Sequence, residues 1–110
     1  MPRDPRAYLW DVLDAVTNIE TFVRNVSLTT FAEDLLVRSA VERQFEIIGE
    51  ALNQLSRTAP EIAARIPELR RIIAFRNLLI HGYAAVNHVL VWQTIHEKLP
   101  GLRCSSRWTC

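Results

Sequence analysis

Glycine and proline are scarce in this chain: three of its 110 residues are glycine and five are proline. Because both residues interrupt regular structure, their scarcity leaves room only for short loops and for no low-complexity linker. Long alternations of β-branched and polar residues, which indicate half-buried strands, are also missing. Leucine, alanine, arginine and glutamate are frequent instead, and all four favour helix. The composition therefore predicts an all-α protein.

Cysteine occurs only near the end of the chain, as Cys104 and Cys110. Two cysteines in a tail cannot form a disulfide framework. With five residues between them and no histidine beside them, they also make a poor metal site. We therefore expect a protein of a reducing compartment, the cytoplasm, with no metal ion and no cofactor.

Long apolar runs are absent as well. None approaches the roughly 18 residues that a membrane-spanning helix requires. The first six residues carry charges and two prolines where a secretory signal has an apolar segment. With 110 residues, of which 49% are hydrophobic, the chain is long enough for one domain with its own core. We expect a single domain that does not enter a membrane.

Lysine is nearly missing, since twelve of the thirteen basic residues are arginine. The formal net charge of +1 gives no overall attraction to nucleic acid. The charge is unevenly spread: residues 57–81 hold five arginines against two glutamates, and residues 1–34 hold three arginines against six acidic residues. Arginine suits phosphate because its planar guanidinium donates two hydrogen bonds at once. The arginine-rich segment is therefore either an ordinary solvated helix surface or a phosphate-binding region.

The first two predicted helices are long and form an antiparallel hairpin. Asp4 as N-cap and Pro5 as first helical residue begin one helix, which runs to about residue 25 or 26. Thr30 and Glu33 form a capping box that begins the next helix, which spans residues 31–57. A short loop between two such helices makes them antiparallel neighbours. The first helix carries a narrow apolar seam at alternating steps of three and four residues, formed by Leu9, Val12, Val16, Ile19, Val23 and Val26.

Shorter helices complete the predicted bundle. Residues 61–66 suit one short helix, and a further helix opens at Pro67 and runs toward His81, with Gly82 as its stop. Asn87 caps a last helix, which the dipeptide 100–101 (Pro-Gly) closes. The sum is an all-α domain of residues 1–102, a four- to five-helix bundle, followed by a loose tail of residues 103–110.

Polar side chains cluster at the end of the helix that approaches His81. At about 100° per residue, Arg76 and Tyr83 fall on the apolar stripe of this helix, and Asn77 and His81 lie one turn apart on the adjoining strip. A charged residue on an apolar stripe needs a partner or faces a cleft. The ordinary alternative is that Arg76 pairs with a carboxylate at the core edge, His81 stabilises the helix end and Tyr83 packs in the core.

The segment from Arg76 to Tyr83 reads R-x4-H-x-Y and resembles the signature of HepT-type HEPN proteins. Residues 43–55 (RQFEIIGEALNQL), 66–83 (IPELRRIIAFRNLLIHGY) and 91–99 (VWQTIHEKL) resemble that family in order and spacing, so that roughly residues 5–102 are covered. The resemblance implies a helical bundle that forms a homodimer and brings two R-x4-H segments together. It also implies a metal-independent endoribonuclease toxin whose partner is a small nucleotidyltransferase antitoxin. In the family that partner can attach AMP to the motif tyrosine, here Tyr83.

The residue types suit RNA cleavage, in which the 2′-hydroxyl of RNA is the nucleophile. An imidazole such as that of His81 can take up or release a proton near neutral pH. Arg76 can hold the phosphate oxygens as their charge grows, and Asn77 can orient His81 or the phosphate. One histidine cannot easily serve both sides of the phosphorus, so we expect a site shared by two copies. The apolar seam of the first helix and the Arg76 face are the candidate interfaces.

Two other functions fit the residues. The bundle could dock a nucleotidyltransferase and present Tyr83, or bind a nucleotide, without catalysis, or it could be an inert helical interaction module. Glu46 and Glu50 stand one turn apart, but we interpret them as a solvated or interface surface rather than a paired-carboxylate site. Trp10 and Trp92 are expected to be core or interface anchors.

Overall fold

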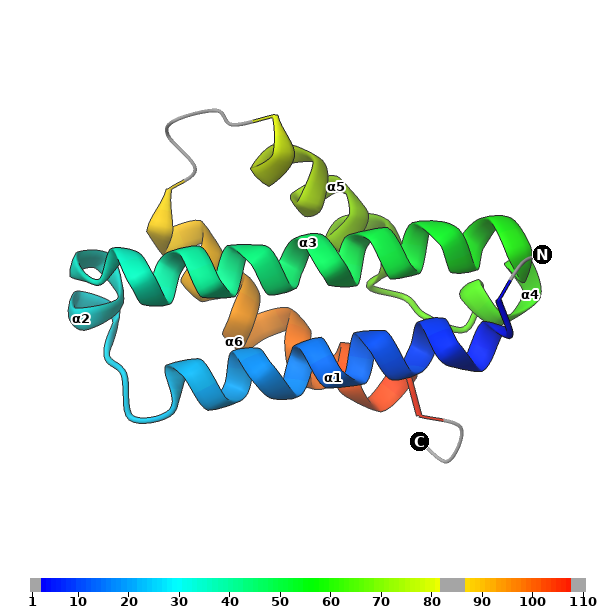
Figure 1. The fold of residues 1–110 in the computed structure, drawn as a ribbon, viewed down its shortest axis with the longest axis horizontal. Helices are drawn as coiled ribbons and strands as arrows, with labels where there is room; N and C mark the ends of the chain where they lie inside the picture. The colour runs from blue at the N-terminus through cyan, green and yellow to red at the C-terminus, as the bar shows by residue number, and fades with distance from the viewer. Residues whose placement is uncertain (1–2, 82–86, 108–110) are drawn as a thin grey trace.

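The computed structural model of the protein describes residues 3–81 and 87–107. Over these ranges it contains helices and no strand, which confirms the all-α prediction. Its longest dimension is 41 Å, and α1 and α3 lie antiparallel along it, with α5 against one side of α3 and α6 crossing behind (Figure 1). The helices are α1 (Pro5–Val23), α2 (Leu28–Glu33), α3 (Leu35–Thr58), α4 (Pro60–Ala63), α5 (Leu69–Ile80) and α6 (His88–Ser105).

Helix α1 begins as expected, because the Asp4 side chain accepts a hydrogen bond from the backbone N–H of Arg6 and Pro5 occupies the first turn. It ends at Val23, and the left-handed backbone of Asn25 (φ 63°) then turns the chain. The middle of the apolar seam is fully buried in the core, so the seam cannot be an interface between copies and that expectation is wrong. The fully buried seam residues are Val12, Val16 and Ile19.

The predicted helix of residues 31–57 is in fact two helices. Ser27, not Thr30, is the first cap, and its hydroxyl accepts a hydrogen bond from the Thr30 backbone N–H at 3.2 Å. The helix is interrupted at Asp34, whose carboxylate caps α3 by accepting a hydrogen bond from the Val37 backbone N–H at 3.1 Å. The break lets α2 turn Phe31 into the core, where it packs against Trp92 of α6 with ring centroids 5.2 Å apart. The Asp34 cap therefore splits the predicted helix into α2 and α3. With this split and the short α4, the described part of the chain holds six helices.

Helix α6 also differs from its prediction. Asn87 caps it as expected, but the helix passes through Pro100 and ends at Ser105. Burial of Leu99 and Leu102 on either side of the proline holds the helix together where one backbone hydrogen bond is missing. The predicted tail therefore begins as helix at residues 103–105, while the domain boundary itself remains a prediction.

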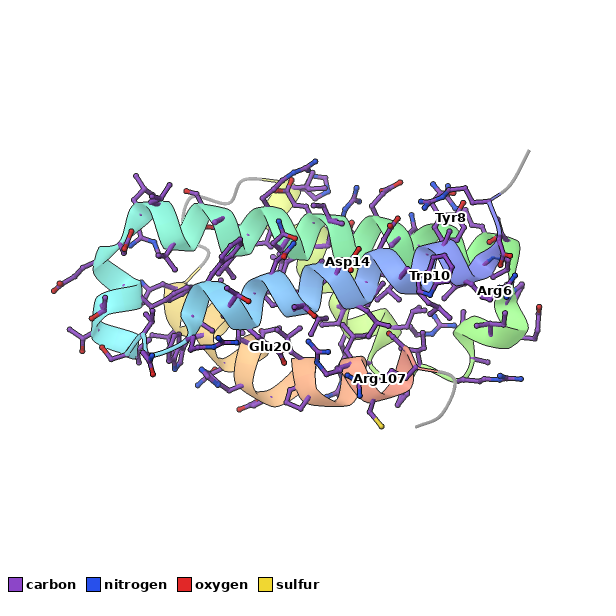
Figure 2. The ribbon with its side chains drawn as sticks, turned by 60° about the horizontal axis from the view of Figure 1, so that its bottom comes forward. Arg6, Tyr8, Trp10, Asp14, Glu20 and Arg107 are labelled. Atoms are coloured by element: carbon purple, nitrogen blue, oxygen red, sulfur yellow. The ribbon has the colours of Figure 1, made fainter. Side chains whose placement is uncertain are left out.

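Contacts with α1 also anchor the end of α6. The Arg103 guanidinium pairs with Glu20 and donates to the Thr17 hydroxyl at 2.8 Å. Figure 2 shows Glu20 on α1 beside α6. Cys104, the penultimate residue of α6, is disulfide-bonded, which departs from the free thiols that a reducing compartment favours. No helix in the described part of the chain is long and apolar enough to cross a membrane.

The packing of α5 on α3 positions the motif. Phe45 of α3 and Phe75 of α5 meet edge to face, with ring centroids 5.0 Å apart. Both rings are buried, as is Ile72 one turn earlier on α5. An aromatic pair of this geometry adds about 1 kcal/mol beyond its area burial. The contact fixes the rotation of α5 at the residue immediately before Arg76.

Candidate functional site

Arg76 is held by one residue of α3 and one of α5. Its Nη2 donates to Glu50 Oε2 at 2.9 Å, and its Nη1 donates to Asn77 Oδ1 at 3.1 Å. The arginine side chain is 23% exposed and that of Glu50 is 50% exposed. Arg76 Nε is buried and makes no hydrogen bond to any described residue. The guanidinium is thus oriented from two sides but still reaches solvent.

Gly49 allows the Arg76 stem to lie directly on the backbone of α3. A Cβ at position 49 would lie 2.3 Å from Arg76 Cβ and 2.4 Å from Arg76 Cγ, distances that no real structure tolerates. Gly49 is itself buried inside a helix, where glycine costs about 1 kcal/mol relative to alanine. Close helix approach explains why glycine stands there. The signal in the sequence is a glycine within the apolar stripe of a long helix, and our sequence reasoning did not use it.

Two grooves flank the contact between α3 and α5. The first, which we call the Arg76 groove, lies between α1, α3 and α5 and encloses about 490 Å³. The second, the Asn77 groove, lies between α3, α4 and α5 and encloses about 620 Å³. Arg76 and Ile80 line the first, and Asn77 lines the second, so the motif forms the ridge between them.

The Arg76 groove carries mixed charge. Its charged residues are Arg3, Arg43, Arg76, Asp11, Glu46 and Glu50. Arg3 pairs with Asp11 at 2.7 Å, and its guanidinium carbon lies 5.0 Å from the centroid of the Tyr8 ring. Tyr8 lies on the side of α1 that faces α3 (Figure 2). The arginines and carboxylates of this groove cancel in formal charge.

The Asn77 groove carries a different lining. Arg70 is its one charged residue, and Asn53, Ser56 and Asn77 supply further polar groups among the described residues. Its apolar lining comes from Pro60, Ala63, Ala64, Ile66, Pro67, Leu69, Ile73 and Ala74. This groove is therefore weakly positive, with hydrogen-bonding groups toward α3 and at the end of the motif.

His81 caps the C-terminal end of α5. It is exposed, and its backbone N–H donates to the Asn77 carbonyl at 3.1 Å. Its backbone is still helical, so five residues turn it about 140° around the helix axis from Arg76. Arg76 and His81 of one copy thus leave α5 in different directions. Gly82 and Tyr83 lie outside the described residues.

The structure changes our interpretation of the glutamates. Glu50 is not a simply solvated residue, because it pairs with Arg76, as the alternative of a carboxylate partner for this arginine predicted. Glu46 is half-buried and lines the Arg76 groove. The clue in the sequence was the arginine on an apolar stripe, but its partner Glu50 stands 26 residues away in the chain.

Among the described residues, no three His, Cys, Asp or Glu side chains gather closely enough to hold a metal ion.

Comparison with known proteins identifies the family of this chain. The sequence model of the family described as "Ribonuclease HepT-like" matches residues 12–106. "Probable ribonuclease HepT" of Thermococcus cleftensis is 34% identical over 103 residues, which cover 94% of this chain and 93% of that protein. "Putative RNase MJ1380" of Methanocaldococcus jannaschii is 30% identical over 101 residues, which cover 92% of each chain. No solved structure shows a significant match. The match spans the helices that carry Arg76, Asn77 and His81, and the chain belongs to the HepT-like family of ribonucleases.

Proposed function

We propose that this protein is a metal-independent endoribonuclease that cuts RNA with Arg76 and His81, supported by Asn77. Family membership supports the reaction class. The observation that carries the assignment of residues is the guanidinium of Arg76, which is oriented by Glu50 and Asn77 at the edge of an open groove. A guanidinium held in this way is already oriented for phosphate oxygens, which bind it by replacing Glu50.

The reaction needs no group beyond RNA and side chains. A base removes the 2′-hydroxyl proton, the 2′-oxygen bonds to phosphorus, the bond from phosphorus to the 5′-oxygen breaks, and an acid protonates that oxygen. Imidazole serves in either role. Arg76 stabilises the charge that grows on the phosphate oxygens, and one such contact is typically worth about 3 kcal/mol of barrier. The products are a 2′,3′-cyclic phosphate and a free 5′-hydroxyl.

A second copy of the chain completes the site in this proposal. Because Arg76 and His81 of one copy diverge by about 140° around α5, one phosphate meets both more easily between two copies. Leu78 and Ile80, on the same helix end, are 43% and 44% exposed. Apolar side chains exposed beside a motif supply the surface that a two-fold contact needs.

A nucleotidyltransferase antitoxin is the proposed partner, in a toxin–antitoxin pair of type VII character. Transfer of AMP from ATP to the Tyr83 hydroxyl, with release of pyrophosphate, would add bulk and a negative phosphate close to Arg76 and His81 in sequence. Such a charge competes with RNA for the arginine. Protein modified by its partner should therefore cleave RNA more slowly than unmodified protein, and equal rates would end this regulatory proposal.

Purified protein tests the catalytic proposal directly. Wild type, Arg76→Ala and His81→Ala are incubated with labelled RNA in the presence of a chelator, and product ends are identified by mass spectrometry. We expect cyclic phosphate ends from wild type and a loss of about 100-fold or more in each variant. His81→Ala cutting as fast as wild type contradicts the mechanism. Intact RNA with all three proteins favours the non-catalytic binding function.

A further inference from the structure

We propose that the Asn77 groove, rather than the Arg76 groove, holds the single-stranded RNA that leads to the scissile phosphate. This inference rests on the proposed ribonuclease function. It goes beyond that function by assigning the path of the substrate to residues outside the R-x4-H-x-Y motif, with Arg70 as the phosphate contact.

Charge decides between the two grooves. An RNA strand brings one negative charge per nucleotide, and its affinity comes largely from contacts of basic residues with phosphate. Three arginines and three carboxylates line the Arg76 groove, and two of these carboxylates, Asp11 and Glu50, already pair with Arg3 and Arg76. No Asp or Glu lines the Asn77 groove within the described chain, while Arg70 does. The Asn77 groove therefore has a net positive charge that attracts a polyanion, whereas the Arg76 groove has none.

The arrangement of α5 suits a strand that runs along the helix. Arg70, Ile73, Ala74 and Asn77 follow one another at helical spacing and share the face that lines the groove. Arg70 and Asn77 are two turns apart, about 10.5 Å along the axis. A charge therefore stands at one end of the face, small and apolar side chains lie in the middle, and an amide stands at the motif end.

Asn77 connects this groove to the catalytic arginine. Its Oδ1 accepts from Arg76 Nη1 at 3.1 Å, although Arg76 itself lines the other groove. A strand that passes Asn77 thus arrives beside the guanidinium. On the opposite wall, Asn53 and Ser56 of α3 offer donors and acceptors to bases or ribose hydroxyls. The groove volume of about 620 Å³ lies within the range that holds a small organic ligand, and so admits a nucleotide unit.

Adjacent arginines provide a matched test. Arg70 and Arg71 are consecutive exposed residues of α5, but only Arg70 lines the groove. Binding of a 2′-O-methyl RNA oligonucleotide, which cannot be cleaved, is measured by fluorescence anisotropy at several salt concentrations. We expect Arg70→Glu to weaken RNA binding about tenfold and to lower the salt dependence of the affinity by about one ion. Arg71→Glu should change the affinity about twofold at most. Equal losses in both variants would overturn the groove assignment.

A second variant fills the groove without changing charge. Ala74 is exposed and lines the groove, so Ala74→Trp occupies its centre, and a thermal melt checks that the fold is retained. We expect weaker RNA binding at an unchanged melting temperature. Unchanged RNA binding with loss of nucleotidyltransferase binding would show that the groove docks protein and would overturn the proposal. If wild type neither binds nor cuts RNA, the ribonuclease function fails; if wild type does both and these variants match it, only the groove assignment fails.

Discussion

The ion pair between Arg76 and Glu50 orients the guanidinium that we propose for catalysis without locking it. Both side chains reach solvent, and a partly exposed pair of this kind is worth no more than about 1 kcal/mol. A phosphate oxygen can therefore replace Glu50 at small cost. In the proposed mechanism the carboxylate also repels the RNA phosphate that Arg76 receives, so Glu50 would both position the guanidinium and compete with the substrate.

Replacement of Glu50 by glutamine separates these two effects. Glu50→Gln keeps an oxygen that accepts a hydrogen bond but removes the negative charge, so we expect severalfold tighter binding of uncleavable RNA. Anisotropy titration measures the affinity. Glu33→Gln, at an exposed position at the end of α2, makes the same charge change elsewhere. Glu50→Gln binding no tighter than this control would show that Glu50 does not compete with RNA.

The shape of the Arg76 head group matters as well as its charge. Arg76→Lys retains a cation but loses the fork, which Glu50 and Asn77 hold through separate nitrogens. We expect single-turnover cleavage to fall about 100-fold while the affinity for uncleavable RNA changes little. Cleavage at the wild-type rate would mean that Arg76 contributes only its charge to binding.

The approach of α5 to α3 depends on one glycine, which makes helix packing testable. Gly49→Ala gains about 1 kcal/mol of helix propensity, but its Cβ would stand 2.3 Å from Arg76 Cβ, so overpacking of about 1–3 kcal/mol dominates. We expect Gly49→Ala to melt at a lower temperature than wild type. We also expect its cleavage rate to fall further than the fraction of unfolded protein explains. Gly101→Ala is the matched control, because its Cβ meets only the flexible carboxylate of Glu68 at 2.8 Å. Equal behaviour of the two variants would contradict the packing argument.

A half-buried glutamate makes the stability of α3 depend on pH. Burial raises the pKa of Glu42, repulsion from Glu46 raises it further, and attraction to Arg38 lowers it in part. Because the pKa in the folded state lies above that in the unfolded state, Glu42 favours folding below the unfolded pKa, and this contribution is lost as pH rises through the folded pKa. We expect Glu42→Gln to be slightly more stable than wild type at pH 7 and no more stable near pH 4. Denaturant titrations at both pH values measure this, and an equal gain at pH 4 would contradict it.

The starts of α1 and α6, which rest on side-chain caps, were predicted, whereas the break at Asp34 and the end of α6, which depend on distant contacts, were not. Asp4 and Asn87 cap α1 and α6 as their local sequence indicates. Asp34 supplies the cap at the break before α3, and the burial of Phe31 against α6, which local spacing cannot reveal, stabilises two helices there in place of one. Helix α6 likewise continues past Pro100 because Leu102 is buried against distant helices. Long-range packing thus overrides local signals.

The candidate site also combines features that local sequence indicates with contacts that only the folded molecule creates. Helical spacing and a family motif mark Arg76, Asn77 and His81 as candidate site residues; the structure joins Arg76 and Asn77 by a hydrogen bond, and the catalytic roles stay a prediction. Glu50 lies 26 residues from Arg76 in the chain, and only the packing of α3 on α5 joins them. The buried seam of α1 shows the reverse case, in which a stripe typical of an interface between chains forms the core of one chain.

Mixing of inactive variants tests whether two copies build one site. If Arg76 of one copy works with His81 of the other, a dimer of one Arg76→Ala and one His81→Ala chain retains one intact site of two. Half of randomly mixed dimers have this composition, so the mixture should regain about a quarter of wild-type cleavage. Arg76→Ala mixed with the double variant is the control and should stay inactive. If both residues act within one copy, no mixed dimer has an intact site, and a mixture that exchanges subunits but stays inactive rejects a site built from Arg76 of one copy and a single His81 of the other.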